Sequence, residues 1–287
     1  MTEFVAGFLH LESQELIEYL LRETGHQQKE KVNPRDLLDY LKLQYLRFDF
    51  MSELPREVKE TFVGTAPRAM ISFHDRLVAT DVSLDERRTK FSVLHEVGHY
   101  ILPGHQNTLY VCDKKGMSYG THLLFEQEAN QVAADLLFLG DRFDQESNSR
   151  PISASTVKTL AFQFGASFEA TARRIAQRSC RECMLVCFSN TSSAIIEAPQ
   201  NLQWHVHYSV PSSSFANKYF QKLTSGGVPE VVYSAVSADG RDIDRSETVE
   251  LLIGCRGLAQ PSRFNAEFFY NRYNVFCFLT PAGCQFQ

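Results

Sequence analysis

The chain has 287 residues, of which 44% are hydrophobic and 22% are charged, and its formal net charge is −5. The length suits more than one domain, and the acidic balance excludes a general electrostatic attraction to nucleic acid or to anionic membranes. Seven scattered cysteines, the lack of an apolar run long enough to span a bilayer and a start unlike a secretory signal lead us to expect a cytoplasmic protein with reduced thiols.

The N-terminal part of the sequence predicts helices followed by a small sheet. Asn33 and Pro34 are typical of the N-cap and first position of a helix, and Gly25 is typical of a helix end. Alternating apolar residues then predict strands, including a hairpin with a two-residue turn at His74 and Asp75. The expected elements are helices over residues 3–23 and 34–43 and strands over 44–50, 60–64, 69–73 and 76–80. The last of these strands is a candidate edge along which an extended peptide could pair.

An amphipathic helix is predicted over about residues 84–102. Ser83 and Glu86 have the spacing of a capping box, and apolar residues follow at intervals of three and four. Pro103 and Gly104 are expected to end the helix.

This helix carries a His-Glu-x-x-His pentapeptide formed by His95, Glu96 and His99. Residues four apart lie on the same face of a helix, so both imidazoles can bind one metal ion, while Glu96 can act on a water molecule as a general base. This is the arrangement of zinc peptidases, which keep an open coordination position for that water. The alternative is a pair of partly buried histidines that hydrogen-bond to neighbours beside a solvated glutamate.

A further helix, predicted over residues 121–139, offers the third protein ligand that zinc needs. The candidates that follow the pentapeptide are His105, Asp113, His122, Glu126 and Glu128. Glu126 shares its side of the helix with small residues such as Ala129, so another helix can approach it closely. Glu128 lies on a polar column and is expected to be a solvated surface charge. We therefore expect Glu126 to complete the site and Asn130 to hold the Glu126 carboxylate or a ligand histidine.

A polar stretch over residues 144–151 is expected to be a linker at a domain boundary. Residues 153–178 then have the pattern of a helix-turn-helix, with a turn at Gly165. Between residues 150 and 182, six Lys or Arg against two Glu give a local balance of 6 − 2 = +4, which would suit contacts to DNA phosphates. The alternative is that these short helices contact protein rather than DNA.

From Met184 onward the sequence predicts a separate α+β domain. Strands are expected over residues 184–188, 194–197, 204–210, 231–236, 249–253 and 268–279, and a helix over 213–223. His205 and His207 alternate on one strand and could form a second metal site or simply lie on a solvated face. Redox activity or metal binding is a further interpretation for Cys180, Cys183 and Cys187.

Two segments of the sequence resemble the signatures of the ImmA/IrrE family of metallopeptidases. Residues 87–102 resemble the active-site helix of that family, and residues 126–137 resemble its second signature, Glu-x-x-Ala-Asn-x-x-Ala. The leading glutamate of that signature ligates zinc in the family, which implies the same role for Glu126. Leu94, in place of a small residue before the first histidine, and Leu137-Phe138-Leu139, in place of Leu-Met-Pro, depart from the family pattern at packing positions.

The resemblance and the order of the elements imply an α+β protein in three parts. These are a thermolysin-like minimal zinc peptidase domain over residues 1–147, a helix-turn-helix module over 148–182 and a C-terminal α+β domain over 183–287 that is similar to GAF sensor domains.

The implied function is that of a zinc-dependent, gluzincin-like endopeptidase of narrow specificity. Zn²⁺ is the expected cofactor, with Mn²⁺ as an alternative in the cell, and the expected substrate is a helix-turn-helix repressor whose cleavage derepresses stress-response or mobile-element genes. A donor to the oxyanion is expected among Tyr100, His105, Tyr110, Tyr119 and His122. The alternative function is that of a DNA-binding transcriptional regulator with a structural or inactive metal site.

Overall fold

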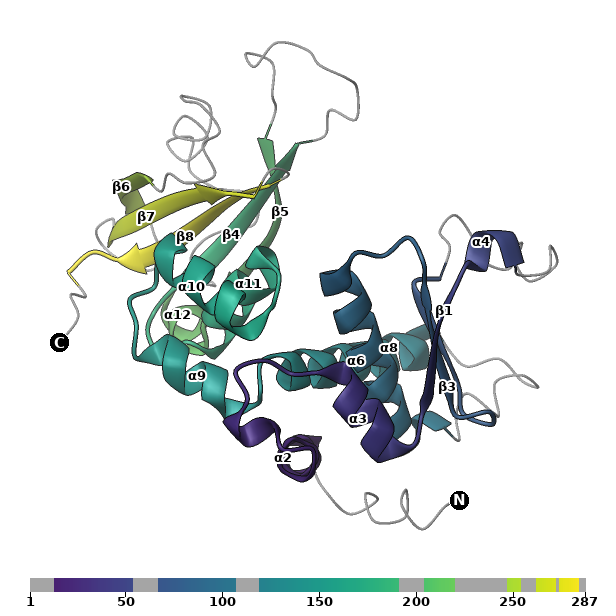
Figure 1. The fold of residues 1–287 in the computed structure, drawn as a ribbon. Coiled ribbons are helices and arrows are strands. Elements are labelled where there is room, and N and C mark those ends of the chain that lie inside the picture. The colour runs from purple at the N-terminus through teal and green to yellow at the C-terminus, as the bar shows by residue number, and fades with distance from the viewer. Residues whose placement is uncertain are drawn as a thin grey trace. The chain divides into compact units, whose positions relative to one another are not determined.

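The computed structural model describes residues 13–53, 67–106, 119–190, 204–219, 247–253, 262–271 and 274–283. The chain divides into two compact units, one of residues 1–143 with 163–165 and the other of residues 144–162 with 166–287. Each unit combines helices with a sheet of its own, which confirms the predicted α+β class (Figure 1). The division into three parts stays a prediction.

The first unit opens with helices that end and begin where the sequence indicates. Gly25 adopts a left-handed conformation (φ 68°) after the first helix, and the Asn33 side chain accepts a hydrogen bond from the backbone N–H of Arg35. These contacts confirm the predicted helix end and N-cap, while residues 3–12 of the predicted first helix lie outside the described residues. The elements are α2 (Ser13–Glu23), the short 3-10 helix η1 (His26–Gln28) and α3 (Pro34–Leu41).

The sheet of the first unit has the order β1-β3-β2, in which β1 pairs parallel and β2 antiparallel with β3. The expectation of an edge strand over residues 76–80 is therefore wrong, because β3 is central and β2 lies at an edge. The predicted two-residue turn is also wrong: Ser72 pairs with Leu77 and leaves four residues between them, the last of which, Arg76, has φ 53°. The strands are β1 (Gln44–Phe48), β2 (Ala69–Ser72) and β3 (Leu77–Asp81).

The short helix α4 (Phe50–Glu53) begins where the strand over residues 44–50 was expected to continue. The Asp49 carboxylate accepts hydrogen bonds from the backbone N–H groups of Met51 and Ser52, which favours a helix start. The strand predicted over 60–64 lies outside the described residues.

Two long helices, α6 (Glu86–Ile101) and α8 (Tyr119–Leu137), pack against each other, and α6 also packs on β2 and β3 (Figure 1). The predicted capping box is wrong, because Asp85 caps α6 by accepting a hydrogen bond from the backbone N–H of Arg88. The Ser83 hydroxyl instead donates to the carboxylate of Asp81, at the end of β3.

The stretch predicted as a linker is largely helical, since α9 spans Asp141–Asn148. Leu139 and Gly140 have φ angles of 57° and 61°, which separate α8 from α9. The polar residues of α9 make specific contacts that a linker would lack: Asp144 forms an ion pair with the buried Arg174, and the Asn148 amide donates to the Asp144 carbonyl.

Helices α10 (Ala154–Phe164) and α11 (Phe168–Arg178) form at the expected positions. Ser153 and Ser167 accept hydrogen bonds from the backbone N–H groups of Thr156 and Ala170, and Gly165 has φ 65° in the turn. Whether this pair is a DNA-binding helix-turn-helix stays a prediction.

The second unit is built on an antiparallel sheet with the order β5-β4-β8-β7-β6. The single strand expected over 268–279 is wrong, because that range contains the end of β7, the connection between the strands and the start of β8. The runs expected over 194–197 and 231–236 lie outside the described residues, and the GAF-like identity stays a prediction. The elements are β4 (Met184–Asn190), β5 (Trp204–Pro211), α12 (Ser213–Lys218), β6 (Glu247–Ile253), β7 (Ser262–Tyr270) and β8 (Val275–Pro281).

Both faces of this sheet are covered. Phe215 of α12 belongs to the core on one face, together with Val186 and Phe188 of β4. On the other face, Phe168 of α11 lies against Phe269, with ring centroids 5.3 Å apart. Among the described residues, no helix has the length and apolar character that crossing a membrane requires.

Candidate metal centre

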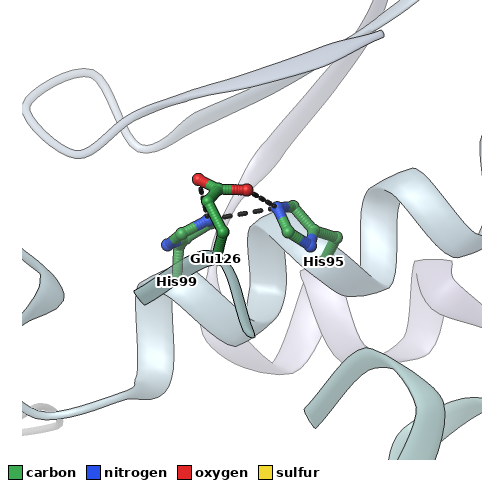
Figure 2. Close-up of side chains that lie close together, drawn as sticks. All are labelled: His95, His99 and Glu126. Atoms are coloured by element: carbon green, nitrogen blue, oxygen red, sulfur yellow. Dashed lines mark hydrogen bonds and ion pairs between the residues drawn. The ribbon is translucent and has the colours of Figure 1, made fainter. Parts of the chain in front are cut away.

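Helix α6 presents His95 and His99 on one face, and Glu126 reaches them from α8 (Figure 2). The side chains of the two histidines are 16% and 8% exposed, and that of Glu126 is 39% exposed. The structure thus brings together the three residues that the sequence predicts as metal ligands.

The distances between the converging atoms suit a single small cation. Nε2 of His95 lies 3.1 Å from Nε2 of His99, and the two nitrogens lie 3.2 and 3.4 Å from the carboxylate oxygens of Glu126. Bonds of roughly 2.0–2.2 Å at tetrahedral angles would separate ligand atoms by about 3.4 Å. Two imidazole nitrogens and a carboxylate oxygen are also a typical donor set for zinc, so these residues fit such an ion.

The close approach of α6 and α8 allows Glu126 to reach the histidines. A Cβ atom at Gly98 would lie 3.0 Å from the carbonyl oxygen of Ala129 and 3.4 Å from Cβ of Val132. Ala129 and Ala133 are fully buried. This confirms the expectation that the small residues beside Glu126 admit a neighbouring helix.

The charges of the cluster favour an ionised Glu126. Hydrogen bonds from His95 and His99 hold the pKa of its carboxyl far below its usual range, against the opposing effect of burial. For His95, burial acts to lower the pKa, but the hydrogen bond to Glu126 and the charges of Glu96 and Glu126 raise it on balance. The site therefore attracts positive charge, whether it is a proton or a metal ion.

Glu96 is a buried carboxylate beside the cluster, with 6% of its surface exposed. Burial raises its pKa, while the neighbouring His95 and His99 act in the opposite direction. The solvated glutamate of the alternative interpretation is therefore excluded at this position.

His105 and Glu128 differ from what the sequence suggests. His105 is fully buried, and its two ring nitrogens lie 2.9 Å from Nδ1 of His99 and 2.9 Å from a carboxylate oxygen of Glu128. Burial lowers the pKa of His105, which favours a neutral ring. Glu128 is thus not simply a solvated charge, and His105 contacts a predicted ligand instead of joining the three converging side chains.

Asn130 favours the protonated form of His95, although Nδ1 of His95 is buried without a hydrogen-bond partner among the described residues. The predicted role of Asn130 stays a proposal. Tyr100 is 4% exposed and stacks on Phe73. Asp113 and Tyr110 lie outside the described residues, as do the side-chain environments of Tyr119 and His122.

The other candidate sites do not form metal clusters in the part of the chain that the structure describes. His205 pairs with the Ser189 hydroxyl at 3.0 Å, and His207 is exposed. Cys183 and Cys187 are buried, and burial raises the pKa of each thiol, to about 11 and about 12. Such thiols are poor nucleophiles at neutral pH.

Several basic side chains of the α10–α11 region contact protein groups within the second unit. Arg174 and Arg178 pair with Asp144, at 3.3 and 3.7 Å, and Arg173 lies over the Tyr208 ring at 4.7 Å. The Arg181 guanidinium donates to the carbonyl of Arg150. These contacts favour the interpretation in which α11 packs on protein.

Comparison with known proteins agrees with the signatures. Residues 58–176 match the family model described as the IrrE N-terminal-like domain, Peptidase_M78. Among solved structures, a transcriptional regulator of Mycobacterium tuberculosis is similar in fold, with a TM-score of 0.53 and 13% identity over 93% of this chain and 74% of that chain. No curated protein sequence gives a significant match. The matched segment contains His95, His99 and Glu126, so the part of the chain that carries the three converging side chains is similar to the IrrE N-terminal-like peptidase domain.

Proposed function

We propose that this protein is a zinc-dependent endopeptidase of narrow specificity. His95, His99 and Glu126 hold the metal, and Glu96 is the general base. The observation that carries the proposal is the convergence of two imidazole nitrogens and a carboxylate within 3.1–3.4 Å of one another. Mn²⁺ is the alternative occupant in the cell.

In the proposed reaction the metal and Glu96 have different roles. Zinc in such a site lowers the pKa of a water molecule and polarises a carbonyl group. Glu96 follows His95 on the helix and its carboxylate is buried, so it can take a proton from the attacking water and deliver it to the leaving amine. The Asn130 amide would hold the ligand His95 or Glu126 in place.

Strand β2 is the candidate surface for binding the substrate backbone. Among the described strands it pairs only with β3, so one of its edges can accept an extended peptide. It also packs on α6, the helix that carries His95 and His99. This corrected assignment replaces β3 in the substrate-binding role.

The proposed substrate is a helix-turn-helix transcriptional repressor, whose cleavage would derepress stress-response or mobile-element genes in the cytoplasm. The match of residues 58–176 to the IrrE N-terminal-like peptidase domain, together with the similar fold of a transcriptional regulator, supports a peptidase linked to transcription.

The test is cleavage of a helix-turn-helix repressor encoded in the same genome, followed by mass spectrometry of the products. We expect cleavage that requires Zn²⁺ or Mn²⁺ and disappears in Glu96→Gln, while that variant still binds one metal ion. A metal-loaded Glu96→Gln variant that cleaves at the wild-type rate would contradict the assigned base.

The second candidate function is a DNA-binding regulator in which the metal is structural. The correctly capped pair α10 and α11 favours it, whereas the contacts of Arg173 and Arg174 with protein groups oppose it. Operator binding that survives metal removal, with no repressor cleavage, would favour this second function.

A further inference from the structure

A chain of hydrogen bonds leads from the candidate metal ligand His99 to the protein surface. Nδ1 of His99 lies 2.9 Å from Nδ1 of His105, and Nε2 of His105 lies 2.9 Å from the Glu128 carboxylate. His99 and His105 are buried, whereas the Glu128 side chain is 57% exposed. These hydrogen bonds therefore join a candidate metal ligand in the interior to a carboxylate at the surface.

The backbone turn after α6 creates this contact. Gly104 has φ 89°, a conformation that L side chains rarely adopt, and it precedes His105, whose ring contacts His99 of α6. The Gln106 amide then donates to the Tyr100 carbonyl at 2.6 Å, which ties the returning segment to α6. The ring of His105 also lies against Phe125 of α8, at 4.4 Å between centroids.

The Glu128 carboxylate fixes where the protons lie. An ionised carboxylate only accepts hydrogen bonds, so Nε2 of His105 must donate to it. In a neutral His105 the other nitrogen, Nδ1, is then an acceptor, and Nδ1 of His99 must donate. When a metal ion replaces the proton between His99 and Glu126, Nε2 of His99 presents the lone pair that a metal ligand requires.

We propose that His105 and Glu128 are positioning residues that hold His99 in its metal-binding tautomer and orientation. The proposal rests on the metal site of the proposed function and assigns a role to two residues outside the three converging ligands. Partners of this kind typically change metal affinity by about 10–100-fold when they are removed.

Glu128→Gln is the most informative variant, because glutamine has the same size but can either donate or accept. An amide that donates to His105 would reverse the direction of both hydrogen bonds. The proton of His99 would then lie on Nε2, where it blocks metal binding. His105→Phe keeps a ring at the buried position and removes both hydrogen bonds. Asp135→Asn is the matched control, since it also neutralises one carboxylate of α8. The Asp135 carboxylate accepts a hydrogen bond from Gln131, which lies outside the metal site.

The experiment measures zinc affinity of the full-length chain by competition with a chromophoric chelator. Visible absorption of the Co²⁺-substituted protein reports the ligand geometry, and ¹⁵N chemical shifts of the histidine rings report the tautomer. We expect about tenfold weaker zinc binding for Glu128→Gln, 10–100-fold weaker binding for His105→Phe and less than a twofold change for Asp135→Asn. The zinc-bound wild type should show a proton on Nδ1 of His99 and on Nε2 of His105.

Equal zinc affinity of Glu128→Gln and Asp135→Asn, with an unchanged Co²⁺ spectrum, would overturn the proposal. A loss confined to His105→Phe would also overturn it, because it would show that the hydrogen bond between His105 and Glu128 does not help to hold His99. The measurement needs no substrate. If the wild type binds zinc but cleaves nothing, the affinities of the variants still test the role of His105 and Glu128. A wild type that binds no divalent metal refutes the proposed function and, with it, the role of these residues.

Discussion

Gly98 of α6 and the carbonyl oxygen of Ala129 in α8 lie so close that a Cβ atom at position 98 would be 3.0 Å from that oxygen. The neighbour is backbone, which cannot rotate away as a side chain can. The separation of the two helices, and with it the reach of Glu126, therefore depends on the absence of a side chain at this position.

Gly98→Ala should lower both the melting temperature and the zinc affinity. Alanine gains about 1 kcal/mol of helix propensity over glycine, but overpacking against backbone costs about 1–3 kcal/mol and pushes the helices apart. Thermal unfolding with and without zinc measures both effects. A higher melting temperature with unchanged zinc affinity would show that α8 can yield without disturbing Glu126.

Zinc should stabilise the folded protein through the three converging side chains. At a free zinc concentration 100 times the dissociation constant, binding to the native state alone adds about 2.7 kcal/mol to the free energy of unfolding. Glu126→Ala should lose most of this increase, whereas the wild type should lose it only when a chelator is added. Thermal denaturation across a zinc titration checks this, and an equal increase in both proteins would place the metal elsewhere.

Lys90 should make stability depend on alkaline pH. Burial, aided by the nearby Lys31, lowers its pKa from 10.5 to about 8. Between these values the unfolded chain binds more protons than the folded one, so this group favours folding increasingly as pH rises from about 8 to 10.5. The benefit is absent below pH 8, where Lys90 is charged in both states.

The matched variant is Lys90→Met, which keeps a long side chain without the charge. Its melting temperature should exceed that of the wild type at pH 7, and the difference should shrink towards pH 10.5. A difference independent of pH would mean that Lys90 titrates normally in the folded protein.

Asp85→Ala should cost about 1 kcal/mol of stability, the usual effect of losing an N-cap. Asp85 accepts a hydrogen bond from the backbone N–H of Arg88 at 2.9 Å, and the sequence had instead indicated Ser83 as the cap. Chemical denaturation of Asp85→Ala and Asp85→Asn distinguishes the loss of the hydrogen bond from the loss of the charge, because asparagine retains the capping oxygen. Equal losses in both variants would point to the charge of Asp85 rather than to its hydrogen bond.

The sequence predicts most of what lies within one helix or at its ends. The spacing of His95 and His99, the small residues next to Glu126 and the caps at Asn33 and Ser167 are local patterns, and the structure bears them out. Each depends on residues a few positions apart, for which helical geometry gives a definite answer.

Several of the errors arise where a residue distant in the sequence binds a group. The segment 144–151 looks like a linker because its residues are polar, but Asp144 forms an ion pair with Arg174, thirty residues later. Glu128 lies on a polar column of its helix, and only the turn at Gly104 brings His105 into contact with it. The central place of β3 depends on its parallel pairing with β1, which no local pattern reveals.

The shortness of β2 bears on how a substrate would be selected. A strand of four residues directs only about half of its peptide groups towards an incoming chain, so main-chain pairing there could align just a brief segment around the bond to be cut. Main-chain pairing over so few residues discriminates little between substrate sequences. Selectivity would then have to come from contacts far from the cut bond, which a folded target offers and a short unstructured peptide does not.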